Sequence, residues 1–365
     1  MNLIKYFIYS NWHLFIILGL DFITSLNLTF YTSNLSVDDT SLLLNFNNLC
    51  GNIIYLLGPL GNISLKLAKN KTSIKYLIIF NIFLVLISTF ILQIITYYKN
   101  NNLYNSELNN FYLLFYNLFT KSLLSILNYY LIGTNNITIL LKFNIFNMLF
   151  NHFIIRYVIN YVSLYKKIIL VNLGDLLSII YMLNNLGKAS SYKNLNYYEC
   201  FQLMIKNSMS IVSLNINNNI TSNMNRYEIK KYHYLSSNFY SFTLLYNPIS
   251  LAIKKNDFPK KFLIKLCTFY YLFVMLLFNI YFYYNQINLN ISNIYLLLYY
   301  IVLLLESESA LDGDVNYGIK VNIVIIISKL IYKYFTRIDN MNNYYFFINL
   351  FFILRILLKV KKKLN

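Results

Sequence analysis

Five ionisable side chains lie inside long apolar runs in the first half of the sequence, where a charge is costly unless it is paired or used. They are Lys121, Lys142, His152, Arg156 and Asp175. If residues 137–162 form a helix, the second, third and fourth of these share one arc of about 80° with Thr138. We interpret the five as a proton or ion relay in which Asp175 supplies the counter-charge. The alternative is structural hydrogen bonding inside a helix bundle, with Arg156 reaching toward the membrane surface.

A second group of ionisable residues directly follows the apolar run that ends at Leu305. It consists of Glu306, Glu308, Asp312 and Asp314. Acids at the C-terminal end of a helix meet its partial negative charge, so they need a cation, a basic partner or a proton. The cluster is therefore either a proton, quinone or divalent-cation site or an exposed acidic loop. Its spacing matches only part of a calcium loop.

Several classes of active site find no support in the sequence. Three histidines are too few for a cytochrome b-type haem pair or a copper–haem oxidase core. The chain has no Gly-rich phosphate loop, no HExxH and no CxxC. Its three cysteines are far apart and unpatterned, so they predict neither a disulfide framework nor a zinc site. We expect no cofactor and no bound metal, and whether the chain is an enzyme stays open.

The elements that must position these residues are membrane-spanning helices. Hydrophobic residues make up 58% of the 365-residue chain and charged residues 12%, whereas soluble domains are about half apolar and a quarter charged. A soluble protein of this size could not bury so much apolar surface, but a bilayer accommodates apolar runs of roughly 20 residues. We therefore predict an all-α, polytopic transmembrane helix bundle with about eight to ten spans.

The apolar runs divide the chain into three regions. The clearest spans are Tyr76–Tyr97, Phe262–Tyr284 and Ile287–Leu305, and further candidates are Trp12–Tyr31, Ser41–Leu60, Phe111–Ile132, Ile137–Val162, Ile168–Leu186, Ile319–Phe335 and Tyr344–Leu358. Gly58 and Pro59 predict a broken or closely packed helix at the end of one of them. The predicted domains are an N-terminal transmembrane bundle over 1–186, a polar and amphipathic middle region over 187–261, and a C-terminal transmembrane bundle with a basic tail over 262–365.

The basic excess points to lipid and not to nucleic acid. The formal net charge is +18, but the lysines lie between and beside the apolar runs, where the positive-inside bias and lipid headgroups account for them. Nucleic-acid binding would need basic residues gathered on a soluble face with aromatic residues between them. We expect phospholipid partners, cardiolipin among them, and no nucleic acid.

The composition also points to a genome. Asn, Ile, Leu, Lys, Phe and Tyr are abundant while Gly and Pro are scarce, which is typical of an A+T-rich genome. The sequence opens without the Arg- and Ser-rich leader of an imported mitochondrial protein. In this texture the whole chain resembles the divergent membrane proteins encoded in ciliate mitochondrial genomes. That resemblance implies a multi-pass subunit of a respiratory-chain complex in the mitochondrial inner membrane.

A local match adds to this resemblance. The segment Glu306-x-Glu308-Ser309-x-Leu311, followed by Gly313 and Tyr317, is similar to the acidic loop of the quinone-site membrane subunit of respiratory complex I. The charged stripe with a mid-span lysine is more loosely similar to the proton-translocating, antiporter-like subunits of the same complex. Both similarities imply other membrane subunits of that complex as partners.

The sequence thus leaves three functions to compare. The leading hypothesis is a membrane subunit of a mitochondrial oxidative-phosphorylation complex, complex I slightly preferred, which scaffolds other subunits and assists proton translocation. A subunit of this kind is favoured over an enzyme by itself. The first alternative is a stand-alone ion or solute transporter, for which the broken helix and the buried charges are suitable. The second is an endoplasmic-reticulum membrane transferase that acts on lipid-linked sugars.

Overall fold

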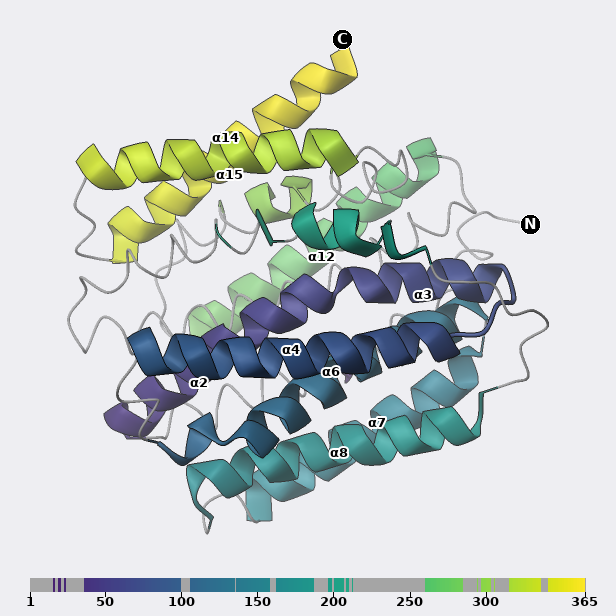
Figure 1. Cartoon of the computed structure of the whole chain (residues 1–365). Helices are drawn as coiled ribbons and strands as arrows, with labels where there is room; N and C mark the ends of the chain where they lie inside the picture. The colour runs from purple at the N-terminus through teal and green to yellow at the C-terminus, as the bar shows by residue number, and fades with distance from the viewer. Residues whose placement is uncertain are drawn as a thin grey trace. The chain divides into compact units, whose positions relative to one another are not determined.

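The structure is a computed structural model in which every element of the described residues is helical (Figure 1). The described residues are 36–99, 106–134, 136–157, 162–186, 260–284, 315–335 and 341–364, together with scattered positions at 16–23, 196–212 and 294–305. The chain divides into two compact units. The N-terminal unit comprises Trp12–Asn207, and the C-terminal unit comprises Met1–Asn11 with Ser208–Asn365.

The described helices of each unit follow one another in chain order. Those of the N-terminal unit are α2 (Val37–Leu57), α3 (Pro59–Lys69), α4 (Lys75–Lys99), the short 3-10 helix η1 (Glu107–Asn109), α6 (Phe111–Gly133), α7 (Ile137–Tyr157) and α8 (Leu164–Asn184). Those of the C-terminal unit are α12 (Lys260–Tyr284), α14 (Val315–Phe335) and α15 (Met341–Leu364). The all-α prediction is confirmed.

Most of these helices are long enough to cross a bilayer. Apart from α3 and η1, they contain 21 to 25 residues, which at about 1.5 Å per residue exceeds the roughly 30 Å of a hydrocarbon core. Among the described residues, Lys75–Tyr98 and Leu164–Asn184 combine this length with the highest apolar character, at mean hydropathies of 2.6 and 1.5.

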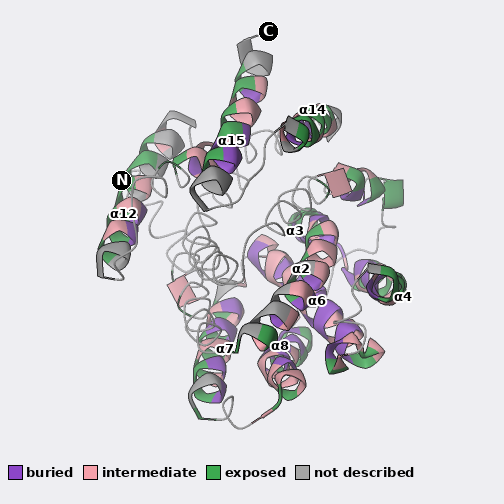
Figure 2. Ribbon diagram, turned by 90° about the vertical axis from the view of Figure 1, so that its left-hand side faces the viewer, coloured by how far each residue is buried: buried purple, intermediate pink, exposed green. Residues whose placement is uncertain are grey.

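Helix α4 shows the surface that such a protein presents to lipid. Its outer side exposes Phe83 and Phe90, each at 57%, and Ile94 at 58%. Its inner side buries Leu77 and Val85 completely, and Figure 2 shows the same division into exposed and buried stripes around the helix. Because large apolar side chains covering one helix face are unfavourable in water, this face is suited to hydrocarbon.

The predicted helix break lies where the sequence placed it. Helix α2 ends at Leu57 and α3 begins at Pro59, with Gly58 between them. Proline at the first position of a helix sacrifices no intrahelical hydrogen bond, because that N–H would have no partner in the helix. The chain can therefore stop one helix and start the next within a single residue.

Helix α6 is the centre of the N-terminal unit. It packs against α2, α3, α4, α7 and α8, and its closest approach is to α3. A Cβ added at Gly133 would lie 2.6 Å from the Cβ of Ala68, and one added at Gly61 would lie 2.9 Å from the Tyr129 ring. The Ser64 hydroxyl also donates a hydrogen bond to the Ile126 carbonyl at 2.6 Å. Small residues at the crossing bring the two backbones together, as is common for helices packed in membranes.

In the C-terminal unit, α14 and α15 pair through a polar seam. The Arg355 guanidinium donates to Asn322 Oδ1 at 2.8 Å, and Tyr317 donates to a backbone carbonyl of α15. The Lys329 ammonium lies 5.7 Å from the centroid of the Phe351 ring. Since Lys329 is 5% exposed, the Phe351 ring takes the place of part of its water.

Candidate functional site

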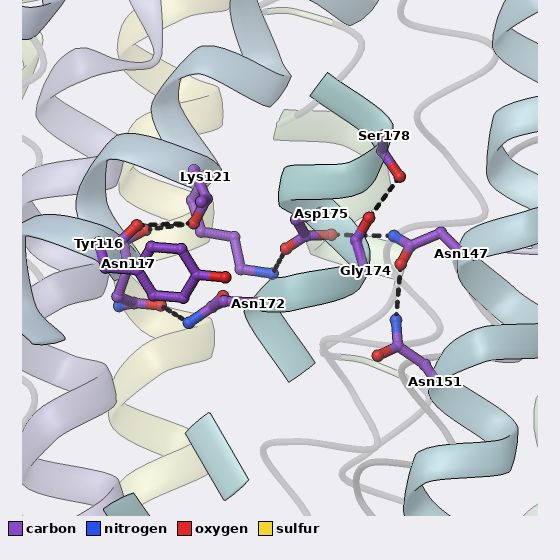
Figure 3. Close-up of polar contacts among 10 residues, drawn as sticks. Tyr116, Asn117, Lys121, Asn147, Asn151, Asn172, Gly174, Asp175 and Ser178 are labelled. Carbon is purple, nitrogen blue, oxygen red and sulfur yellow. Dashed lines mark hydrogen bonds and ion pairs between the residues drawn. The ribbon is translucent and has the colours of Figure 1, made fainter. Parts of the chain in front are cut away.

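The centre of the candidate site is an ion pair between Lys121 of α6 and Asp175 of α8 (Figure 3). The Lys121 ammonium contacts Oδ2 of Asp175. Only 3% of the Asp175 side chain is exposed, against 36% of that of Lys121. Both residues lie near the middle of helices of 21 and 23 residues, so the pair is at the depth where an ionised group most needs a partner.

The second carboxylate oxygen of Asp175 is held by α7. Asn147 Nδ2 donates to Asp175 Oδ1 at 2.9 Å, and Asn151 Nδ2 donates to Asn147 Oδ1 at 2.9 Å. Figure 3 shows Asp175 between Lys121 on one side and Asn147 on the other. The Oδ1 atom of Asn151 is buried and accepts no hydrogen bond from the described residues. Such a buried acceptor is costly unless water or a cation occupies it.

Gly174 makes this contact between α7 and α8 possible. A Cβ at this position would lie 2.6 Å from Asn147 Oδ1 and 2.8 Å from the Phe150 ring. Only a glycine lets α8 approach α7 so closely that Asn147 reaches Asp175. The hydroxyl of Ser178, one turn along, donates to the Gly174 carbonyl and satisfies the backbone beside the site.

A second polar bridge links α6 and α8 close to the ion pair. Asn172 Nδ2 donates to Asn117 Oδ1 at 2.9 Å, and both side chains are buried. Residues 117 and 121 are one turn apart on α6, as are 172 and 175 on α8. The amide bridge and the ion pair therefore occupy successive layers of one interface, in which the two helices run in the same direction.

The predicted relay residues reach different places. The structure joins Lys121 to Asp175, whereas the side chains of Lys142 and His152 are exposed on α7. Arg156 belongs to α7, but its side chain lies outside the described residues. The α7 arc that meets Asp175 is the one carrying Asn147 and Asn151. The relay role of Lys142, His152 and Arg156 stays a prediction.

The predicted acidic site cannot be placed. Glu306, Glu308, Asp312 and Asp314 all lie outside the described residues. Most of the predicted middle region, 187–261, lies there as well. Both therefore stay predictions.

Sequence reasoning gave the amide groups of the site no role. Asn117 and Asn172 carried no signal, because asparagine is common throughout this chain. Asn147 and Asn151 did carry a signal in the sequence, because they are four residues apart on the arc of α7 opposite its cations. Four residues bring two side chains onto the same helix face, where amides can bond each other.

Comparison with known proteins identifies the fold of this chain. No family model and no curated protein sequence matches the chain. Among solved structures, it is similar to the outward-facing form of a multidrug resistance MATE family transporter of the MOP superfamily, at 11% identity and a TM-score of 0.57, over 96% of this chain and 92% of the other. The inward-facing form matches at 10% identity and a TM-score of 0.60, over 95% and 92%. A MOP superfamily transporter from Pyrococcus furiosus, reported with a binding pocket of reversed polarity, matches at 11% and 0.59, over 96% and 92%.

These findings correct three predictions. The resemblance to ciliate mitochondrial respiratory proteins and to the quinone-site subunit of complex I is wrong, because the similar folds are those of transporters. The leading function, a subunit of an oxidative-phosphorylation complex, is wrong on the same finding. So are the expected partners, other membrane subunits of a respiratory complex, since the similar structures are those of transporters. Composition misled because A+T-rich coding gives unrelated membrane proteins the same texture.

The other two sequence predictions concern the fold and its location. The match extends over nearly the whole chain, so it includes both units. The predicted polytopic transmembrane helix bundle is confirmed, and so is a multi-pass membrane location. This chain has the fold of the MATE family transporters, and it is a multi-pass membrane protein.

Proposed function

We propose that the chain is a stand-alone membrane transporter that couples the movement of a small organic solute to protons bound and released at Asp175. The observation that carries this proposal is the Lys121–Asp175 pair, with a buried carboxylate and a lysine that is one third exposed in mid-span. A lysine at that depth does not face hydrocarbon, because the cost of the charge is too high. Its exposed part therefore faces a water-accessible path.

The pair can act as a switch because the contact between α6 and α8 depends on the negative charge of Asp175. While Asp175 is ionised, it holds the Lys121 ammonium of α6 against α8. When a proton binds the carboxylate, Asp175 becomes neutral and Lys121 loses its counter-charge. The attraction between α6 and α8 then weakens, and the helices gain freedom to separate. Release of the proton restores the contact.

The amides of α7 support the same role. Asn147 donates a hydrogen bond to the carboxylate and so fixes its position beside Lys121. The buried Oδ1 atom of Asn151 offers an acceptor for a water molecule beside the pair. A water there would extend the polar network away from Asp175 along α7.

The fold supports transport over the other functions considered. The similar structures include multidrug transporters captured in both outward-facing and inward-facing conformations, which means that this architecture admits alternating access. This chain spans almost all of that architecture. We infer a small organic molecule as the solute, by analogy with those transporters. The analogy rests on fold alone.

Transport assays in reconstituted vesicles test the proposal. The purified chain is placed in liposomes loaded with either ethidium, a cation, or carboxyfluorescein, an anion, and a pH gradient is imposed. We expect gradient-dependent movement of one dye and its loss in Asp175→Asn. The matched control is Asp38→Asn, the same chemical change at an exposed acid in the first turn of α2. If neither dye moves, and proton flux does not differ between the parent and Asp175→Asn, the proposal is refuted.

The compartment is proposed from the sequence. The A+T-driven composition and the basic excess beside the apolar runs favour the mitochondrial inner membrane for this transporter. Fractionation of the source cells tests this location. If the chain separates from mitochondrial inner-membrane markers, the location is wrong and the transport function is unaffected.

A further inference from the structure

An open polar cavity lies at the end of the N-terminal unit where α6 and α8 both begin. Its volume is about 890 Å³. Every side chain on its wall carries a polar group, among them Gln93 of α4, Asn110 before α6, and Ser163 and Lys166 at the start of α8. Glu107 and Lys166, both exposed, give it one charge of each sign. A roomy cavity with such a wall holds water.

The interface between α6 and α8 leads from this cavity to the ion pair. On α6, residues 110, 114, 117 and 121 are spaced by four, three and four, which places them on one face. On α8, residues 165, 168, 172 and 175 are spaced by three, four and three, which does the same. The hydrogen bond between 117 and 172 and the ion pair between 121 and 175 fix the register of the two faces.

This register orders the interface into four layers. The cavity contributes the first, with Asn110 and Tyr165. Leu114 and Ile168 form the second, at 2% and 9% exposure, within one apolar cluster. The amide bridge is the third and the ion pair is the fourth. At about 1.5 Å per residue, the cavity mouth is roughly 16 Å from the pair along α6.

We propose that the cavity and this interface form a proton access path to Asp175, and that Leu114 and Ile168 are its gate. Water enters the cavity but not the apolar layer, because a constriction lined by aliphatic side chains excludes water. Protons move along water chains, so the path is closed in this conformation. The Lys121 side chain of the ion pair is meanwhile partly exposed on another side. The ion pair is thus separated from the cavity by the apolar layer, while it is accessible from the exposed side of Lys121.

The proposal rests on the proposed function and adds a route to it. When α6 and α8 separate on protonation or solvation of the pair, the Leu114 and Ile168 side chains part first from each other, since no polar contact joins them in that layer. Water from the cavity then reaches the amides of Asn117 and Asn172, and through them Asp175. One binding event thereby changes the side from which the carboxylate exchanges its proton.

A proton leak assay tests the gate without any solute. Parent and variants are reconstituted in liposomes containing a pH-sensitive dye, and a potassium diffusion potential drives protons inward. Leu114→Ala removes half of the apolar layer, and we expect it to raise proton influx about tenfold. The matched control is Leu123→Ala, which truncates an equally buried leucine on the opposite side of α6. The leak must return to the parent level in Leu114→Ala/Asp175→Asn.

Chemical modification tests the cavity in a chain with an intact gate. Ser163→Cys places a thiol on the cavity wall, and a positively charged methanethiosulfonate reagent should slow the proton-driven dye movement of this variant. Tyr112→Cys is the control, because Tyr112 is 78% exposed at the same helix end but is not on the wall. The parent, with its own three cysteines, gives the baseline.

The outcomes separate the two proposals. If the parent moves dye with a pH gradient, but Leu114→Ala leaks no faster than Leu123→Ala and modification at 163 has no effect, the access path is refuted and transport stands. A leak that persists without Asp175 also refutes the path, because the protons then bypass the carboxylate. If the gate variant leaks through Asp175 but the parent moves no dye, solute transport is refuted and the path stands.

Discussion

Gly174→Ala tests whether a single missing methyl group builds the candidate site. The added Cβ would lie 2.6 Å from Asn147 Oδ1, which is 0.8 Å inside the 3.4 Å of ordinary contact, and 2.8 Å from the Phe150 ring. Asn147 can yield only by rotating its amide, which breaks its 2.9 Å hydrogen bond to Asp175. Otherwise α7 and α8 must move apart. Either response removes Asn147 from the carboxylate.

The expected loss of stability follows from two costs, the overpacking and the broken hydrogen bond. Overpacking at a helix contact costs about 1–3 kcal/mol, and a hydrogen bond to a charged group contributes about 1.5–3 kcal/mol. Rotation of Asn147 relieves part of the first while forfeiting the second, so the terms do not add. We expect Gly174→Ala to lower the free energy of unfolding by about 2–4 kcal/mol.

Unfolding in mixed micelles of increasing denaturing detergent measures this change. The control is Gly51→Ala, which makes the same substitution on α2 where a Cβ meets nothing within 4 Å. That variant should be neutral or more stable by up to about 1 kcal/mol, because alanine is the better helix former. If the two variants have equal stability, α7 and α8 are not held together as closely as the geometry requires, and the account of the site fails.

Three further predictions use the same unfolding measurement. Lys121→Met leaves Asp175 buried without its cation. It should lower the free energy of unfolding by an amount toward the lower end of about 3–5 kcal/mol, because Lys121 is partly exposed. Lys121→Met/Asp175→Leu should recover most of that loss, and no recovery would contradict the pairing. Gly133→Ala brings a methyl group to 2.6 Å from the Cβ of an alanine on α3 and to 3.0 Å from a backbone carbonyl, so it should cost about 1–3 kcal/mol, and a neutral effect would exclude the close crossing. Arg355→Met removes the hydrogen bond to Asn322 and should lower the free energy of unfolding by about 1.5–3 kcal/mol. Asn322→Leu/Arg355→Met should lower it by less than the sum of the two single changes. Simple additivity would show that the two residues do not interact.

The extent to which the sequence could predict this molecule differs between the fold and the site. Runs of apolar residues identified the helices, because a bilayer forces both their length and their composition. The sharp stop at Gly58 and Pro59 was equally readable, since proline acts locally. The pairing of helices was not: nothing in a single sequence says that α6 lies beside α8. Lys121 was therefore recognised as costly and Asp175 as a counter-charge, but the sequence did not show that these two residues pair with each other and not with the cations of α7.

The site also shows why composition can mislead. In a chain this rich in asparagine, one amide says little, and Asn117 and Asn172 acquire meaning only when two helices bring them together. The same bias produced the wrong functional assignment, because a coding preference was interpreted as kinship. Spacing within a helix was the more reliable signal, as Asn147 and Asn151 demonstrate. It depends on geometry and not on the abundance of a residue type.

The crossing of α3 and α6 has a mechanical consequence. With Gly133 against Ala68 and Gly61 against the Tyr129 ring, the crossing leaves little space between the two helices, and the Ser64 hydroxyl donates a hydrogen bond to the backbone of the other helix. Sliding or rolling either helix would drive atoms into backbone. We therefore expect α3 and α6 to move together as one rigid body, so that any rearrangement within the N-terminal unit takes place at the other contacts of α6.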